Sequence, residues 1–255
     1  MVTRRDFTGP KTARIVPSSV PLFPGFLAAL VALIMGASGL GIVRAPVPDS
    51  VRRLDLAKVY FEFNSSANDL GVHVLLDGED WKTLAIVNPE GVTIFEVDGK
   101  GPYEDLGMTE LFFEGAEPSL DEVPLDELLG LFPQGRYAFS GKTVGGGGVR
   151  GTATLTHSIP AGPDVSAVAG ENDSLIIHWE AVTGPPDGFP DEPVNVIGYQ
   201  VTVEAFQVTL PDTTLHVTVP PEFVASLGSG VHLFEVLAME AGWNQTITEG
   251  SVVMP

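Results

Sequence analysis

The chain has 255 residues, with 13 Lys and Arg against 33 Asp and Glu, and it has no cysteine. The lack of cysteine excludes disulfide bonds, thiolate metal sites and cysteine nucleophiles. Residues 46–255 hold 8 basic and 32 acidic side chains, a formal charge of −24, which excludes nucleic acid as a partner because phosphate binding needs clustered Lys and Arg. The acidity indicates a soluble surface or, more narrowly, a divalent-cation site.

The first 45 residues indicate export from the cytoplasm. Four basic residues precede residue 15, residues 15–43 carry no charge, and small residues follow the apolar centre. A basic start, an apolar centre and a small-x-Ala end are typical of a secretory signal peptide. We expect residues 1–45 to be removed by cleavage after Ala45, with cleavage after Ala37 as the alternative.

Two further interpretations of this segment stay open. Thr3-Arg-Arg-Asp-Phe7 resembles the twin-arginine export motif of bacteria. The alternative is a general signal peptide, in which the two arginines only supply positive charge. Residues 22–43 are also long enough for an uncleaved anchor in the inner membrane, although Pro24 and four glycines interrupt them. The protein is therefore expected to be periplasmic or secreted, or else anchored by residues 22–43.

Residues 46–57 are expected to be a linker, and residues 58–158 an all-β domain. Short runs rich in β-branched and aromatic residues alternate with Gly, Pro, Asn and Asp, which is the pattern of strands separated by turns. The expected strands are residues 58–63, 71–76, 81–87, 92–97, 109–114, 136–141 and 149–157. A turn at Asp77-Gly78 is expected to end the second strand. About seven strands in about 100 residues are typical of an immunoglobulin-like sandwich.

One short helix is expected within this domain, at about residues 124–132. Pro124 suits the first turn of a helix, and four apolar residues from Leu125 to Phe132 share one face at helical spacing. A brief helix before a Tyr-bearing strand, here with Tyr137, is common in immunoglobulin-like sandwiches.

A second domain is expected over residues 159–255, after the proline-rich boundary 159–163. Trp179 lies in one strand-like run, and Tyr199 lies in the next, beyond a loop rich in Pro and Gly. This arrangement resembles a fibronectin type III domain. The resemblance implies a second antiparallel β-sandwich, and the area that a buried Trp removes from water favours a core position for Trp179. His232 stands where the family usually has a tyrosine that makes a corner hydrogen bond.

No catalytic or cofactor-binding residue stands out. Gly141-Lys-Thr143 resembles the end of a phosphate-binding loop, but Gly135 lies one residue too far upstream, and the run alternates like a strand. The five histidines lack close ligand spacing, and His178 and His216 are expected to face outward. The carboxylates are too many to single out a catalytic pair.

One acidic cluster is a candidate cation site. Asp77, Glu79 and Asp80 follow one another within a predicted turn, and hard cations such as Ca²⁺ prefer oxygen ligands clustered on turns. The cluster lacks the spacing of an EF-hand loop. The alternative interpretation is an acidic hairpin turn without an ion.

The best candidate for recognition is the loop between the Trp179 and Tyr199 strands. Phe189 is flanked there by Asp187 and Asp191, and loops at the end of a sandwich often carry binding residues. The alternative is a stiff loop that packs on its own domain or on the first one.

The sequence therefore predicts a bacterial exported all-β protein built from two tandem antiparallel β-sandwiches. Its expected function is a non-catalytic interaction or structural role outside the cytoplasm, with a protein or carbohydrate partner at the cell surface or in the periplasm. One alternative is a carboxylate-based hydrolase or enzyme accessory module. Another is a calcium-stabilised adhesion module. No cofactor is expected otherwise, and calcium is the one alternative. Membrane contact is expected only through an uncleaved N-terminal segment.

Overall fold

A computed structural model describes residues 51–254 of the chain. The predicted signal or anchor and most of the predicted linker lie outside the described residues. Within the described part, no helix has the length and apolar character needed to cross a membrane.

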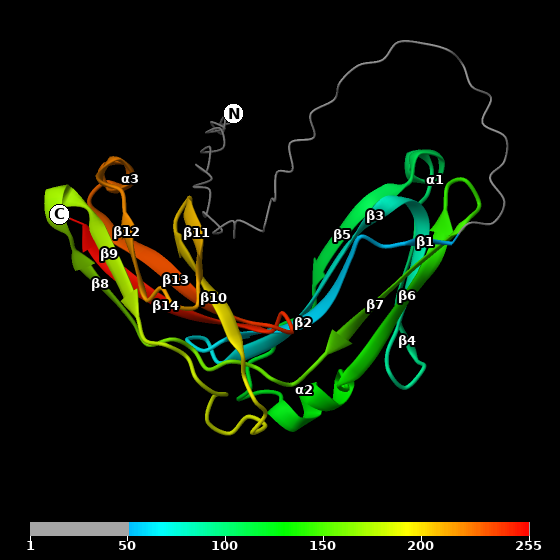
Figure 1. Cartoon of the computed structure of the whole chain (residues 1–255), viewed down its shortest axis with the longest axis horizontal. Coiled ribbons are helices and arrows are strands. Elements are labelled where there is room, and N and C mark those ends of the chain that lie inside the picture. Colours follow the sequence, from blue (N-terminus) through cyan, green and yellow to red (C-terminus); the bar gives the residue numbers. More distant parts are fainter. Residues whose placement is uncertain (1–50, 255) are drawn as a thin grey trace, which may run out of the picture. The chain divides into compact units, whose positions relative to one another are not determined.

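The described chain is all-β, with a few short helices (Figure 1). In chain order the elements are β1 (Arg52–Arg53), β2 (Leu56–Asn64), β3 (Asp69–Val87), β4 (Thr93–Asp98), α1 (Pro102–Leu106), β5 (Met108–Glu114), α2 (Leu125–Leu131), β6 (Gly135–Thr143), β7 (Gly148–Leu155), β8 (Val165–Ala169), η1 (Glu171–Asp173), β9 (Leu175–Trp179), β10 (Val196–Val203), β11 (Phe206–Pro211), β12 (His216–Val219), α3 (Pro221–Leu227), β13 (Gly230–Glu240) and β14 (Gln245–Met254). The sheet therefore begins within the stretch 46–57 that the sequence predicts as linker.

The first sandwich is organised around one long strand, β3, of 19 residues. Its first half pairs with β2 and β5, and its second half pairs with β4 and β6, beyond which lie β7 and β1. A strand that passes from one sheet to the other forms a corner of the sandwich. The alternating residues Val59, Phe61 and Phe63 of β2 face the core beneath it, together with the fully buried Trp81.

The turn predicted at Asp77-Gly78 is wrong, because β3 continues through it. The pairing registers of β3 shift between residues 77 and 83, and Asp80 has a φ of 43°. These are the marks of a β-bulge, which bends a strand without ending it. The Asp-Gly pair thus lies at a bend, because neighbouring strands pair with the backbone on both sides of it.

The second sandwich packs the three-stranded sheet β12–β9–β8 on the strands β11, β10, β13 and β14. This is the fibronectin type III or immunoglobulin-like class of fold. Trp179 and Tyr199 both lie in its core, with ring centroids 5.5 Å apart, as predicted. The sequence prediction misses β11: residues after Val203 turn at Glu204, whose φ is 50°, and form a hairpin with β10.

Both sandwiches contain a corner hydrogen bond to a carbonyl four residues upstream. In the first, the Tyr137 hydroxyl donates to the Pro133 carbonyl at 3.1 Å. In the second, His232 Nε2 lies 3.2 Å from the Gly228 carbonyl. Histidine therefore replaces the expected tyrosine and makes the same type of contact.

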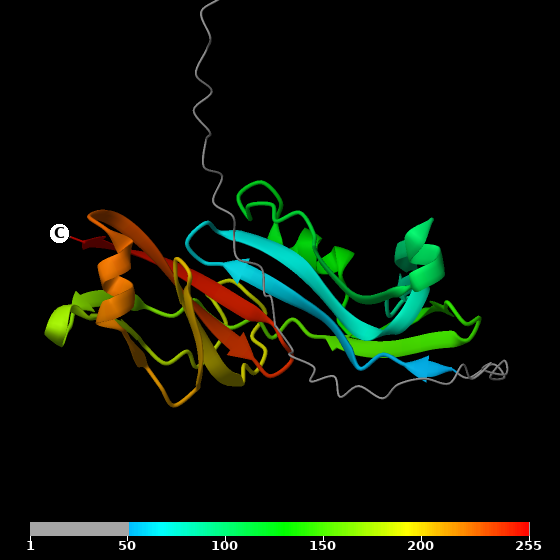
Figure 2. The same cartoon turned by 90° about the horizontal axis from the view of Figure 1, so that it is seen from above.

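The two sandwiches are joined by direct strand pairing (Figures 1 and 2). β14 runs parallel to β2, with Gln245 opposite Glu62 and Ile247 opposite Asn64, so that one sheet continues from the first sandwich into the second. We call this junction the seam. Ser65 extends it, because its backbone N–H and its hydroxyl both donate to the Ile247 carbonyl.

Asn244, directly before β14, is a fully buried polar side chain at the seam, with 0 % of its surface exposed. Its Oδ1 accepts the Phe61 N–H at 2.9 Å, and its Nδ2 donates to the carbonyls of Thr156 and Ser158 at 2.9 and 3.2 Å. One amide thus ties the start of β14 to β2 and to the segment that links the sandwiches. Aliphatic side chains offer no such donor and acceptor pair.

Replacing Asn244 by Ala should destabilise the protein by about 2–4 kcal/mol, because it leaves a buried N–H and two buried carbonyls without their partner. Chemical denaturation measures this loss. Asn195→Ala is the control, since Asn195 is exposed. An Asn244→Ala variant as stable as the control would show that the seam does not depend on this side chain.

Candidate functional site

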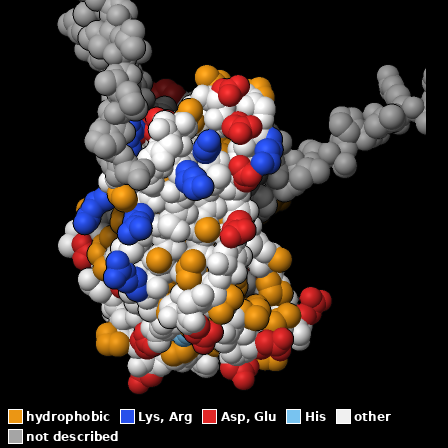
Figure 3. Space-filling view, turned by 90° about the vertical axis from the view of Figure 1, so that its right-hand side faces the viewer, with side chains coloured by type: hydrophobic (Ala, Val, Ile, Leu, Met, Phe, Trp, Pro, Cys, Tyr) orange, Lys and Arg blue, Asp and Glu red, His pale blue; other side chains and the backbone are white. Residues whose placement is uncertain are grey.

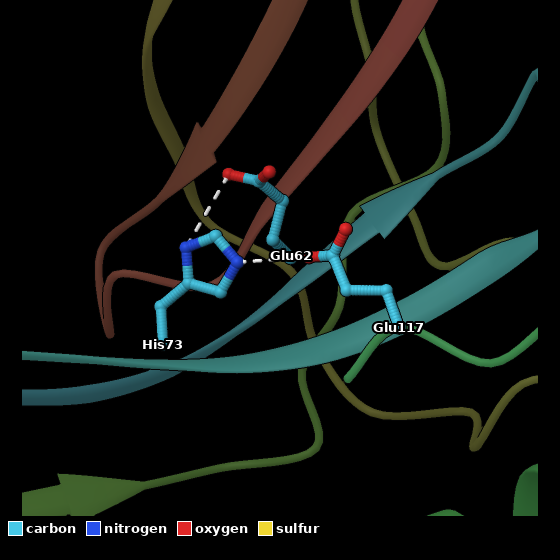
Figure 4. Close-up of side chains that lie close together, drawn as sticks. All are labelled: Glu62, His73 and Glu117. Atoms are coloured by element: carbon cyan, nitrogen blue, oxygen red, sulfur yellow. Dashed lines mark hydrogen bonds and ion pairs between the residues drawn. The ribbon is translucent and has the colours of Figure 1, made fainter. Parts of the chain in front are cut away.

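A buried histidine lies between two glutamates beside the seam (Figure 4). His73 belongs to the first half of β3, opposite Tyr60 of β2, and points away from the core because side chains alternate along a strand. It is nevertheless only 3 % exposed. The rings of Tyr60 and Phe112 cover it, with centroids 5.3 and 5.9 Å from the imidazole.

The two carboxylates contact different ring nitrogens. His73 Nε2 lies 3.0 Å from Glu117 Oε1, and His73 Nδ1 lies 3.8 Å from Glu62 Oε2. Ionised carboxylates only accept hydrogen bonds, so both contacts are satisfied together when both ring nitrogens carry a proton. The geometry therefore fits an imidazolium held between two carboxylates.

Two backbone features place Glu117 over the histidine. The segment after β5 runs along the start of β3, where the Leu70 N–H donates to the Pro118 carbonyl at 3.3 Å. Gly71 lies directly beneath: a Cβ there would come within 2.5 Å of Glu117 Cγ. The missing side chain of Gly71 thus leaves the space through which Glu117 reaches His73.

The pKa values of the cluster follow from burial and charge. Burial by itself lowers the pKa of His73, but the hydrogen bond that its ring donates to Glu117 and the charges of Glu62, Glu117 and Glu114 outweigh it, so the pKa is raised. Burial raises the pKa of Glu62, against the opposing effects of His73 and of a hydrogen bond from Gln245. The pKa of Tyr60 is also raised, first by burial and then by nearby carboxylates.

The second sandwich takes part in the cluster through Gln245. Its amide donates to Glu62 Oε2, the same oxygen that faces His73. Gln245 is also the residue opposite Glu62 in the β14–β2 register. The charge state of the cluster is therefore coupled to the first residue pair of the seam.

The same three residues are the metal-ligand candidates of the described chain. Their ligand atoms lie within 4.8 Å of one another, and one imidazole with two carboxylates suits Zn²⁺ and similar ions better than Ca²⁺. The two carboxylates, however, each lie nearest to a different ring nitrogen. This arrangement favours a protonated imidazole between two carboxylates over one metal ion bound by all three residues.

The predicted cation residues are placed apart from this cluster. Asp77 and Glu79 are exposed on the bend of β3, and Asp80 is half-buried. Arg52 of β1 pairs with Asp80 at 2.9 Å and lies 3.6 Å from Glu79. Two of the three carboxylates thus face a guanidinium, which competes with any cation for the same oxygens.

The predicted recognition loop packs against the first sandwich. Phe189 is partly buried against the first core, and its ring lies 4.8 Å from that of Phe63. Asp187 and Asp191 remain exposed on either side. Glu192, farther along the loop, accepts a hydrogen bond from Ser158 at 3.2 Å. The aromatic ring therefore serves packing between the sandwiches, and the two aspartates are the surface that the loop presents.

Sequence reasoning misses the His73 cluster for a specific reason. His73 and Glu117 are 44 residues apart, so their spacing resembles no ligand motif. One signal does exist in the sequence: Glu62 and His73 occupy outward positions of two adjacent strands that pair in a hairpin. Strand alternation alone assigns such positions to solvent, whereas in the structure Phe112, Glu117 and Gln245, all distant in sequence, lie against them.

Comparisons with known proteins give no family. No family model matches the chain, and neither does any curated protein. A two-domain fibronectin type III segment of chicken tenascin is 12 % identical, with 79 % of this chain and 99 % of that chain covered and a TM-score of 0.28. A bacterial ice-binding adhesin gives 14 % identity, coverage of 80 % and 64 %, and a TM-score of 0.27.

A third match is the spore cortex lytic enzyme SleM of Clostridium perfringens, at 16 % identity and a TM-score of 0.28. It involves 38 % of this chain, which spans only 28 % of the length of that enzyme. At TM-scores this low the three likenesses carry no argument about activity or partners. The fold and the His73 cluster have to be interpreted from their own geometry.

Stability should fall as the pH rises above about 6.5, the ordinary pKa of histidine, and through the raised pKa of His73. The reason is linkage: in this window the folded protein holds a proton that the unfolded chain releases, at a cost of up to about 1.4 kcal/mol per pH unit. Denaturant melts between pH 6 and pH 9 measure the slope.

The variant His73→Gln should flatten that slope, whereas His178→Gln, which alters an exposed histidine, should keep it. Equal slopes in the wild type and in His73→Gln would contradict the imidazolium interpretation.

Gly71→Ala should move Glu117 away from His73 and cost about 1 kcal/mol, the worth of a typical hydrogen bond. The pH slope should shrink at the same time. Gly115→Ala is a matched control nearby, since a Cβ there makes only ordinary contacts, with the Val72 carbonyl oxygen at 3.4 Å and the Val72 nitrogen at 3.8 Å. If both variants behave alike in pH-dependent melts, Gly71 has no role in positioning Glu117.

Proposed function

We propose that this chain is a non-catalytic structural and interaction protein that works outside the cytoplasm. The observation that carries the proposal is the seam, where β14 pairs with β2 and Asn244 is buried among backbone groups of the first sandwich. Two sandwiches on a flexible linker would move independently. Hydrogen-bonded strand pairing and a buried amide resist such motion, as a structural unit requires.

The cluster around His73 supports the same function. Both ring nitrogens face carboxylates, and the imidazole is 3 % exposed, so the histidine is engaged and covered rather than open to a substrate. A general base needs to come within hydrogen-bond reach of the proton that it removes. The carboxylate-based hydrolase of the sequence analysis would have to use other groups.

The partner and the location belong to the proposal as well. A signal peptide or inner-membrane anchor over residues 1–45 would bring the sandwiches to the periplasm, the cell surface or the medium. A protein or carbohydrate partner would bind there, and the exposed Asp187 and Asp191 of the loop offer one place for it. Calcium stabilisation through Asp77, Glu79 and Asp80 stays a separate proposal, checked by melting with and without millimolar Ca²⁺.

Differential scanning calorimetry tests the structural part of the proposal. If the seam holds the sandwiches together, the chain should unfold in one transition whose calorimetric and van't Hoff enthalpies agree. Thr246→Val, which removes a buried hydroxyl that donates to the Pro160 carbonyl, should lower or split that transition. Two transitions in the wild-type protein would contradict a single unit.

A paired screen tests the interaction part. The full chain is used in a protein pull-down and on a carbohydrate array, and the same preparation is assayed against a broad set of hydrolase substrates. The proposal expects a reproducible binder and no turnover. Turnover without any binder would overturn it in favour of the enzyme.

A further inference from the structure

Within residues 51–254, which the structure describes, the basic side chains are confined to the first sandwich. Residues 151–255 contain no Lys or Arg and 13 Asp and Glu, whereas all eight basic residues beyond position 45 lie between 52 and 150. Several of the basic side chains gather on the face shown in Figure 3. Residues 51–150 hold 18 Asp and Glu beside these eight basic residues, so a positive field that attracts anions is expected only where the basic side chains gather.

Three arginines line a half-open recess of about 830 Å³ on the outward face of β1, β7 and β6: Arg53, Arg136 and Arg150. All three are exposed, and no carboxylate of the described residues forms an ion pair with any of them. Asp55 also lines the recess. The lining thus carries three positive charges and one negative charge.

Two of these arginines are direct cross-strand neighbours. β1 and β7 pair in parallel with Arg53 opposite Arg150, so both guanidinium groups leave the same face of the sheet. Like charges directly opposite each other destabilise a sheet. Such a pair in a chain with so few basic residues is a cost to folding that an anionic ligand would offset.

The arginines that line the recess are spaced along the strands. Arg136 lies four residues before Ser140 on β6, and Ser140 is paired with Arg150 on β7. At the rise of a strand this places the two arginine positions about 13 Å apart along the strands. Small exposed residues, Ala138 and Thr152, form the floor between them.

We propose that this recess binds an extended acidic peptide, with carboxylates engaged by Arg136 at one end and by the Arg53–Arg150 pair at the other. In an extended chain, side chains four residues apart share a face and lie about 13 Å apart, which matches the spacing of the arginines. Guanidinium groups bind carboxylates in a bidentate manner. No exposed aromatic ring lines the recess, so it lacks the stacking platform that would favour a sugar polymer.

This proposal rests on the proposed interaction role and names an acidic peptide as the ligand. It is tested by an experiment separate from the calorimetry and the binding screen. Fluorescence anisotropy is measured on the full chain with two labelled peptides of identical composition, Glu-Ser-Ser-Ser-Glu and Glu-Glu-Ser-Ser-Ser. The first should bind more tightly, and its affinity should fall with added salt. Equal binding of the two peptides would reduce the recess to a diffuse positive patch and overturn the assignment.

Substitutions identify the site. Arg53→Gln, Arg136→Gln and Arg150→Gln should each weaken binding of the first peptide about fivefold or more. Lys100→Gln removes the same charge outside the recess and should leave binding unchanged. A loss in Lys100→Gln as large as in Arg150→Gln would contradict a built site.

Two further readouts complete the test. Arg150→Gln should melt at the same or a higher temperature than the wild type, because it relieves the facing pair; a large drop would show a structural arginine instead. Polygalacturonate, an acidic polysaccharide, should bind more weakly per carboxylate than the spaced peptide. Tighter binding of the polysaccharide would replace the peptide as the ligand class. If the protein unfolds in one transition but binds neither the peptide nor the polysaccharide, the proposed structural role of the seam stands and the proposed ligand of the recess is wrong.

Discussion

The Asn244 side chain is the contact on which the arrangement of the two sandwiches depends. Its amide accepts from β2 and donates to the linking segment, and it lies directly before the strand that pairs with β2. The partners of this buried amide are three backbone groups and the Thr156 hydroxyl, and any other position of the amide leaves those groups unsatisfied, so it has few alternative arrangements. The seam is therefore specific as well as stabilising.

The His73 cluster places charged side chains beside this junction. Glu62 connects the two: one of its oxygens faces His73 and also receives the Gln245 amide from β14. Burial opposes ionisation of Glu62, and the imidazolium favours it. The contact between Glu62 of β2 and Gln245 of β14 is therefore expected to be most stable when His73 is protonated. The arginine recess lies on other strands, β1, β7 and β6. Its lining holds three arginines and one aspartate, whereas the second sandwich holds acidic side chains and no Lys or Arg.

Local patterns predict the elements of this fold well, and its long-range contacts poorly. The alternation of Val59, Phe61 and Phe63 predicts β2, and the apolar face from Leu125 predicts α2, because each pattern is set by neighbours in the chain. Asp77-Gly78 is a sound local turn signal, but pairing on both sides of β3 makes it a bend. Asn244 and Phe61 are 183 residues apart, and no spacing rule connects them. The same distance problem hides the contact between His73 and Glu117.

Native-state hydrogen exchange at the Phe61 amide tests the central claim most directly. This N–H donates to Asn244 Oδ1, so it is protected only while the seam is closed. If the two sandwiches form one cooperative unit, the amide should exchange with the free energy of global unfolding, like the amides of Val201 and Val236 in the second core. Exchange of the Phe61 amide at a much lower free energy, with both cores still protected, would show that the seam opens by itself and would contradict the account.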